Sequence, residues 1–502
     1  MEKPTGTAER GEFLQGGAEG LSLSERGGSF SFGKEEGEWM EADVRRQQEE
    51  LFERMPVPRA VMKLVLPTIA ASLVTVLYSL ADTYFVGLLE QPVQTAAVTL
   101  AAPVLLAFNA INNLFGVGSA SMMSRALGRK DMQTVRASAA FGFYGALLCS
   151  VLFSVLCTVF QRPLLLLLGA DSLTLPVTAR YLVWTVSAGA APAILNVVMA
   201  HMIRSEGSAM HASIGTMSGA LLNILLDPVF VLPWGLDMGA EGAALATFLS
   251  NCIALGYFLV YLRVRRGATN VCLSPRYLRL KRDIVLGVCG VGVPASVQNL
   301  LNVVASSAIN ALAAPFGAEA LAAMGICTRA SMVPMYLAFG LSQGLMPLIS
   351  YNFSSGNHPR LRASLAFAAK IDLGILCAVG ALQFAFSGAV VRLFLNDVTT
   401  VAYGTVFLRG MCLSLPPMGV DFLAVAVFQA TGMGRESLLF AVVRKLVFEI
   451  PMLYLLNALW PLYGLPYAQF GSELLTAVLA AIVLLRFLRR LGAGNAMPAR
   501  EG

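Results

Sequence analysis

Long apolar stretches separated by short polar loops dominate this sequence of 502 residues. A helix needs about 20 apolar residues to cross the hydrocarbon core of a bilayer, and the stretches reach that length. Only 13% of the residues are charged, whereas a soluble domain carries roughly a quarter. The sequence therefore predicts an all-α polytopic membrane protein with twelve spans: 60–88, 95–123, 136–160, 180–203, 210–233, 240–263, 283–312, 319–350, 366–394, 403–430, 438–459 and 464–488.

Basic residues are concentrated in every second loop. They follow the second, sixth and eighth spans and the last one, at Arg125, Arg129, Lys130, Arg136, Arg263, Arg265, Arg266, Arg276, Arg279, Lys281, Arg282, Arg360, Arg362, Arg489 and Arg490. Loops rich in Lys and Arg stay in the cytoplasm, so we expect both termini to be cytoplasmic. We interpret these side chains as topology signals and expect no nucleic-acid partner.

The first 54 residues differ from the rest in composition. They are rich in Gly, Glu and Ser and show no apolar periodicity, so we predict a disordered cytoplasmic tail over 1–54. They lack a basic segment followed by an apolar one, so we expect no secretory signal peptide here.

The two halves of the membrane region repeat. Pro and Gly positions recur in order at offsets of 223 to 228 residues, at Pro67/Pro294, Gly116/Gly344, Gly128/Gly356, Gly207/Gly432 and Pro228/Pro451. Six spans per half give both halves the same orientation, a transporter design with a central cavity. We predict a first lobe over 55–263, a basic linker over 264–282, a second lobe over 283–490 and a cytoplasmic tail over 491–502.

Two carboxylates lie inside apolar spans of the first half. Asp82, in VLYSLADTYFVG, has Tyr78 four residues before it, and Asp227, in ALLNILLDPVF, has Asn223 four residues before it. Residues four apart share a helix face. A charge at the bilayer centre costs about 2.5–3.5 kcal/mol on insertion scales, so such residues usually face a cavity or a partner.

The spacing places both aspartates at a similar depth, in the outer half of the membrane. Burial and a second nearby carboxylate favour protonation near physiological pH, which a proton-coupled carrier needs. Ionised carboxylates could instead hold Na⁺ together with the oxygens of Asn223 and Thr247. The structural alternative is that the aspartates only fix helix packing through hydrogen bonds. We expect H⁺ or Na⁺ as coupling ion and no other metal or cofactor.

The second half does not repeat this pair. Its intramembrane acids are Asp421, in mid-span, and Glu449, which a pairing with Lys445 four residues earlier would explain. Arg329 is interpreted as a buried cation that ties helices together. The further candidates for polar contact with substrate, or for a role in the second lobe, are Tyr78, Asn196, Asn302, Arg329, Asp421 and Glu449.

The sequence contains none of the common catalytic motifs. The sequence has no GxxxxGK[ST] loop, so ATP does not drive transport directly, and it has no HExxH motif or nucleophile elbow. We therefore expect no enzymatic activity. An intramembrane enzyme stays the remote alternative from another functional class.

Several segments resemble the multidrug and toxic compound extrusion (MATE) family. They are PTIAASLVTVLYSLADTYFVG, GVGSASMMSRALGRKD, LLNILLDPVF, GAEGAALAT and FGLSQGLMPLISYNFSSGN, and the likeness covers about residues 55–490. The resemblance implies two six-helix lobes that alternate between outward- and inward-facing states and exchange organic cations for H⁺ or Na⁺. It also implies an acidic site in the first lobe, which corresponds here to Asp82, Asn223, Asp227 and Thr247.

One departure separates this chain from some sodium-coupled members. They have a glutamate in the seventh helix, where this sequence has Asn302, and an aspartate in the tenth, near Asp421. The pattern is more similar to the DinF-like bacterial branch, which implies coupling through the first lobe.

The resemblance leads to a specific functional hypothesis. We expect a monomeric antiporter of a bacterial inner (plasma) membrane that exports small organic molecules. The alternative is a flippase for a lipid-linked saccharide, which would need a strongly basic cavity.

Overall fold

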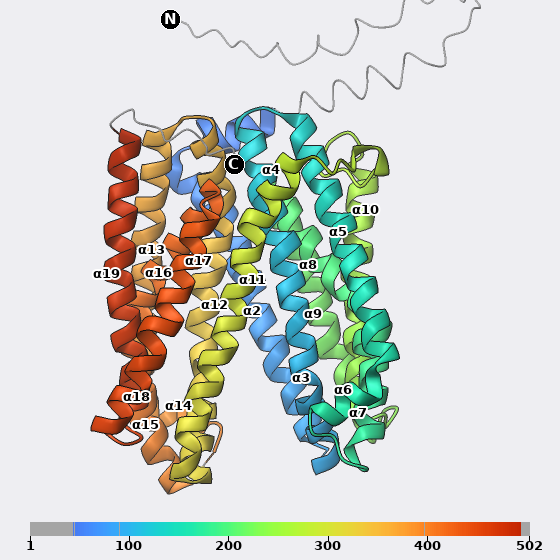
Figure 1. The fold of residues 1–502 in the computed structure, drawn as a ribbon, viewed down its shortest axis with the longest axis vertical. Helices are drawn as coiled ribbons and strands as arrows, with labels where there is room; N and C mark the ends of the chain where they lie inside the picture. Colours follow the sequence, from blue (N-terminus) through green and yellow to red (C-terminus); the bar gives the residue numbers. More distant parts are fainter. Residues whose placement is uncertain (1–43, 45, 90, 396, 493–502) are drawn as a thin grey trace, which may run out of the picture.

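The computed structural model describes residues 44, 46–89, 91–395 and 397–492, which form a bundle of helices without strands (Figure 1). The bundle has two lobes, as predicted. The tail residues 1–43, 45 and 493–502 lie outside the described part of the chain.

The first lobe contains the helices up to residue 264. A short π-helix, η1 (Glu50–Arg54), precedes them. They are α2 (Val57–Gly87), α3 (Pro92–Asn112), η2 (Asn113–Val117), α4 (Gly118–Gly128), α5 (Met132–Val159), α6 (Gln161–Leu167), α7 (Thr174–Leu182), η3 (Val183–Ser187), α8 (Ala190–Ser205), α9 (Ala209–Val231) and α10 (Ala240–Val264).

The second lobe follows a connection that holds only the short η4 (Pro275–Tyr277). Its helices are α11 (Arg282–Ala313), η5 (Ala314–Phe316), α12 (Ala318–Ser354), α13 (His358–Ala385), α14 (Ser387–Arg392), α15 (Val398–Leu413), α16 (Leu415–Thr431), α17 (Gly434–Val442), η6 (Val443–Glu449), α18 (Ile450–Leu459) and α19 (Gly464–Gly492).

Nine helices in the described residues are long and apolar enough to cross a membrane, and two bent pairs raise the number to eleven. The bent pairs are Thr174–Ser187 with Ala190–Ser205, and Val398–Leu413 with Leu415–Thr431. The predicted eleventh span is absent from this count. It is built from α17, η6 and α18, and it contains the charges of Arg444, Lys445 and Glu449.

The lobes meet near one end of the bundle, which we call the basic end because the loops with Arg129, Arg266 and Arg360 lie there. The ribbons of α11 and α4 lie close at this end, and α11 diverges from α3 toward the other end, which we call the far end (Figure 1). Ser121 Oγ of α4 donates to the carbonyl of Gln429 at 2.5 Å. Arg125 Nη2 donates to the carbonyl of Gly287 at 3.3 Å.

Glycines make this lobe contact close. A Cβ at Gly118 would lie 2.4 Å from the carbonyl oxygen of Val288, and one at Gly292 would lie 2.0 Å from that of Leu114. Small residues let helix backbones approach closely inside membranes. The glycines therefore allow the two lobes to pack backbone against backbone near the basic end.

Two sequence-based expectations need correction. Residues 46–54, in the predicted disordered tail, are helical, and Phe52 among them is fully buried. Arg329 is exposed and not buried as predicted, because α12 buries the opposite face, with Cys327 and Ala330.

Candidate functional site

Asp227 is the centre of a polar group inside the first lobe. It lies near the far end of α9, its side chain is fully buried, and Asn223 lies one turn earlier on the same face. In the amide orientation that satisfies both ends of Asn223, its nitrogen donates to Asp227 Oδ2 at 2.9 Å. Its oxygen then accepts from the hydroxyl of Thr247 on α10 at 3.1 Å. The other carboxylate oxygen, Oδ1, is buried without a hydrogen-bond partner among the described residues.

Asp82 and Tyr78 bring α2 to the same group. Both side chains are half-buried, and Asp82 interacts electrostatically with Asp227. The hydroxyl of Tyr78 lies near Thr247 and within electrostatic range of both aspartates. The structure thus brings together the four residues that the sequence predicted as a cation site.

Tyr181 is a member of this group that the sequence did not reveal. It lies on α7, is buried, and interacts electrostatically with Asp82, Tyr78 and Asp227. Its helix forms the first part of a bent span, so its position depends on the bend. No spacing in the sequence indicates it.

This arrangement has the chemistry of a small-cation site. A buried carboxylate is stable when it is neutralised, either by a proton or by a cation. The unpartnered Oδ1 of Asp227 leaves one acceptor for that purpose, and the hydroxyls of Tyr78 and Thr247 supply further oxygen atoms. The same atoms fit H⁺ and Na⁺, because hard cations prefer oxygen ligands.

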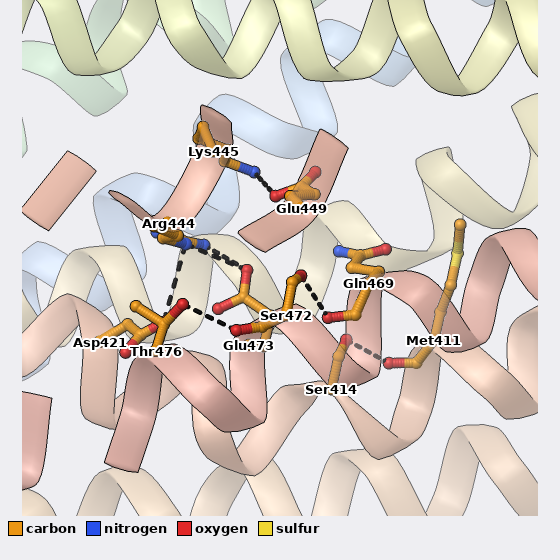
Figure 2. Close-up of polar contacts among 10 residues, drawn as sticks. All are labelled: Met411, Ser414, Asp421, Arg444, Lys445, Glu449, Gln469, Ser472, Glu473 and Thr476. Carbon is orange, nitrogen blue, oxygen red and sulfur yellow. Dashed lines mark hydrogen bonds and ion pairs between the residues drawn. The ribbon is translucent and has the colours of Figure 1, made fainter. Parts of the chain in front are cut away.

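The second lobe contains a separate cluster of buried charges (Figure 2). Arg444 of η6 donates from Nη2 to Glu473 Oε1 of α19 at 2.5 Å and from Nε at 3.1 Å. Asp421 of α16, also fully buried, has its Oδ2 3.7 Å from Arg444 Nε. One guanidinium thus connects three helices.

A second ion pair involves Lys445, the residue that follows Arg444 in η6. Lys445 Nζ donates to Glu449 Oε2 at 2.5 Å, which confirms the pairing expected from their spacing (Figure 2). Arg444 and Glu473 were not among the residues predicted from the sequence. Glu473 is the only acid of its span, and that isolation was the available signal.

The remaining polar candidates lie apart from these groups. Asn196 of α8 is buried and donates to Asn251 Oδ1 at 2.8 Å, a contact between neighbouring helices. Asn302 is half-buried on α11, and Arg329 is exposed on α12.

The sequence profile of the MatE family matches this chain twice, over residues 67–229 and 294–455. The chain belongs to the MatE family. The two matches begin at Pro67 and Pro294, the first pair of the internal repeat, so each lobe of this MATE transporter corresponds to one copy of the family unit. Which branch of the family it joins stays a prediction.

Curated relatives cover nearly the whole MATE region. The multidrug export protein MepA of Staphylococcus aureus (strain MRSA252) is 31% identical over 448 residues, which are 89% of this chain and 97% of MepA. MepA of Staphylococcus saprophyticus subsp. saprophyticus has the same identity and coverage.

Solved structures show the same two-lobe fold. An outward-facing multidrug resistance MATE transporter of the MOP superfamily superposes with a TM-score of 0.82, at 26% identity, and covers 88% of this chain and 98% of that one. A MOP superfamily transporter from Pyrococcus furiosus, described as having a binding pocket of reverse polarity, has a TM-score of 0.79, 26% identity and the same coverage.

Proposed function

We propose that this protein is a cation-coupled antiporter that exports organic, mostly cationic, drugs across the plasma membrane of a bacterium by alternating access. The coupling ion is H⁺ or Na⁺. The observation that carries the proposal is the buried Asp227, whose Oδ1 has no hydrogen-bond partner within the described part of the chain while Asn223 and Thr247 fix the rest of the side-chain group. The relatives named for multidrug export support the substrate class.

The direction of export follows from the distribution of basic residues. The positive-inside rule makes the basic end cytoplasmic, with both termini on that side. The lobes pack against each other at this end, which supports an outward-facing state. In that state the group around Asp227 exchanges its cation with the outside and releases substrate.

Antiport requires that cation and substrate compete. A cation bound at Asp227 neutralises the carboxylates and removes their attraction for a cationic drug. Binding of the ion from the outside therefore releases the drug to the outside. The carboxylates bind the drug again after the ion leaves to the cytoplasm. We propose that the transporter works as a monomer, with the bilayer and the transported molecules as its partners.

The flippase alternative needs surplus positive charge in the cavity. The buried cations of the second lobe, Arg444 and Lys445, are each paired with carboxylates, and Arg329 is exposed. These pairs give no support for recognition of an anionic lipid headgroup.

The test is export of a fluorescent organic cation from proteoliposomes, with pH and Na⁺ gradients imposed separately. The intact protein is expected to export the dye under one gradient. Asp227→Asn and Asp82→Asn are expected to abolish export at normal expression. Asp237→Asn is the matched control: Asp237 is exposed at the far end, with φ of 51°, a conformation that Asn tolerates.

Two outcomes would contradict the proposal. Wild-type export by the double variant Asp82→Asn/Asp227→Asn would refute the site. Export of no cationic dye by the intact protein, together with movement of a lipid-linked saccharide, would favour the flippase.

A further inference from the structure

The chain just before α2 lies across the junction of the two lobes at the basic end. We call residues 46–55 the clasp. The clasp consists of the helical residues 46–49, η1 and Met55. Pro56, which has an extended backbone with ψ of 134°, separates the clasp from α2. Leu51 and Phe52 are buried, so the clasp is docked on the protein and does not project from it.

One side of the clasp contacts the first lobe and the connection that follows it. Gln48 Nε2 donates to the carbonyl of Glu206 at 3.2 Å, and Gln48 Oε1 accepts from Asn270 Nδ2 at 3.3 Å. Leu51 packs against Gly207, where a Cβ would lie 2.9 Å from Leu51 Cδ2. Gly207 has φ of 97°, so the tight turn and the close approach both require glycine.

The opposite side is held by Arg360 of α13, in the second lobe. Its Nε donates to the carbonyl of Phe52 at 2.6 Å, and its Nη2 donates to the carbonyls of Leu51 at 3.2 Å and Met55 at 2.6 Å. The last carbonyls of a helix have no partner within the helix. A guanidinium there forms charge-assisted bonds and also offsets the negative end of the helix dipole.

Tyr351, near the end of α12, completes the second-lobe contact. Its ring stacks on Phe52, with centroids 4.7 Å apart and planes 12° from parallel. Its hydroxyl donates to Glu53 Oε1 at 2.7 Å. Tyr351 also touches the first lobe, because a Cβ at Gly128 would lie 2.4 Å from its carbonyl oxygen. The clasp therefore binds where the lobes themselves are in contact.

We propose that the clasp is a conformational lock: it holds the lobes together at the basic end and releases Arg360 and Tyr351 whenever the lobes separate there. The inference rests on the alternating access of the proposed function. Two lobes that move apart cannot both keep a ten-residue segment with short bonds to each. Pro56 connects the clasp directly to α2 of the first lobe, so the contacts that break are those to the second lobe.

The experiment measures distances between spin labels in the full chain in lipid nanodiscs. The eight cysteines are first replaced, and the labels are then placed on exposed residues of the two lobes. Arg263 and Pro359 report on the basic end, and Leu173 and Val398 report on the far end. The protein with a native clasp is expected to show mainly the short distance at the basic end.

Two variants remove second-lobe contacts: Arg360→Gln and Tyr351→Phe. Each is expected to raise the population with separated basic ends at least threefold and to shorten the far-end distance in the same molecules. Glu53→Gln keeps an acceptor for Tyr351 and is expected to stay near the native distribution. Arg54→Gln, on the exposed side of the same segment, is the matched control.

Unchanged distance distributions in both Arg360→Gln and Tyr351→Phe, with unfolding temperatures near that of the parent, would overturn the lock. If Arg360→Gln does not fold, the comparison of Tyr351→Phe with Glu53→Gln tests the lock, because only Tyr351→Phe is expected to shift the distances. The measurement needs no substrate or ion gradient. A protein that shows these shifts but exports no dye would count against the proposed function and not against the lock.

Discussion

Arg444 and Glu473 form a two-bond ion pair inside the second lobe, at 2.5 and 3.1 Å, although both side chains are almost fully excluded from solvent (Figure 2). Asp421, Glu473 and Glu449 supply three carboxylates to this region, and Arg444 and Lys445 supply two cations. With all five groups ionised the cluster carries a net charge of −1, and a single proton on one of the carboxylates makes it neutral. We therefore assign the second-lobe cluster mainly to helix packing.

Breaking this pair should unfold the protein more easily. Removal of one partner of a buried ion pair typically costs about 3–5 kcal/mol, because it leaves an uncompensated charge. Arg444→Met is therefore expected to lower the unfolding temperature markedly in detergent. Arg435→Gln, an exposed arginine on the adjoining α17, is expected to leave it unchanged. Equal unfolding temperatures for the two variants would refute the structural role of Arg444.

The variant Asp421→Asn tests whether the second-lobe cluster takes part in ion coupling or only in helix packing. Arg444 keeps Glu473 as partner in this variant, so the guanidinium is not left uncompensated. We expect dye export to stay within about threefold of the parent and to keep its dependence on the ion gradient, unlike export by Asp227→Asn. Loss of the gradient dependence in Asp421→Asn would instead place a coupling ion in the second lobe.

Asn223 should matter through the carboxylate that it orients. Asn223→Ala removes the donor to Asp227 Oδ2 and the acceptor for Thr247. A hydrogen bond to a charged group contributes about 1.5–3 kcal/mol. Its loss in Asn223→Ala is therefore expected to change the affinity for the coupling ion by roughly tenfold or more. The measurement is the ion concentration for half-maximal export. Asn196→Ala, which breaks the contact to Asn251 away from this group, is the control.

The glycines of the lobe contact give a steric test. A methyl group at residue 292 would clash with the carbonyl of Leu114, whereas one at residue 290, on the same helix, meets nothing within 4 Å. Gly292→Ala is expected to disfavour the packed basic end, to cost about 1–3 kcal/mol and to slow export. Gly290→Ala should behave as the parent. Spin-label distances at the basic end check the prediction, and identical behaviour of the two variants would contradict it.

Glu206 should make the clasp region sensitive to pH. It lies between α8 and α9, outside the spans, and burial raises its pKa from 4.5 to about 7 against opposing hydrogen bonds from Asn270 and Thr269 and the charge of Arg265. A raised pKa in the folded state stabilises the protein most at low pH. The stabilisation is lost as the pH rises through about 7.

The corresponding measurement is hydrogen exchange of residues 46–55 and 206–208 between pH 6 and 8. After correction for the intrinsic rates, protection is expected to fall as the pH rises. Glu206→Gln should remove this pH dependence while keeping hydrogen bonding to Thr269. Protection that stays constant in the parent would show that Glu206 does not titrate in this range.

The sequence predicted the membrane helices well because apolar length is a direct requirement of the bilayer. It also predicted Asp82, Asn223 and Asp227 as one group, because helical spacing and depth are sufficient to align them. Tyr181 could not be predicted in this way. Its position depends on a bent span, which packing and not periodicity decides.

The errors have physical causes as well. Arg329 was expected to be buried because it lies within an apolar span. When a helix is apolar on all sides, however, its sequence does not indicate which face packs against the protein. Residues 46–54 of the clasp were predicted to be disordered because the first 54 residues are rich in Gly, Glu and Ser and show no apolar periodicity. Its helix depends on tertiary contacts, above all the bonds from Arg360, and these are not visible in local sequence.

The charges of η6 also affect how the chain enters the membrane during synthesis. Each Lys or Arg at the centre of a span costs about 2.5–3.5 kcal/mol at the translocon, so the segment of α17, η6 and α18 is a poor independent insertion unit. Lys445 pairs with Glu449 within the segment, whereas the charge of Arg444 is compensated only by Asp421 of the preceding span and Glu473 of the following one. We therefore expect the last three spans to insert into the membrane together and not one by one.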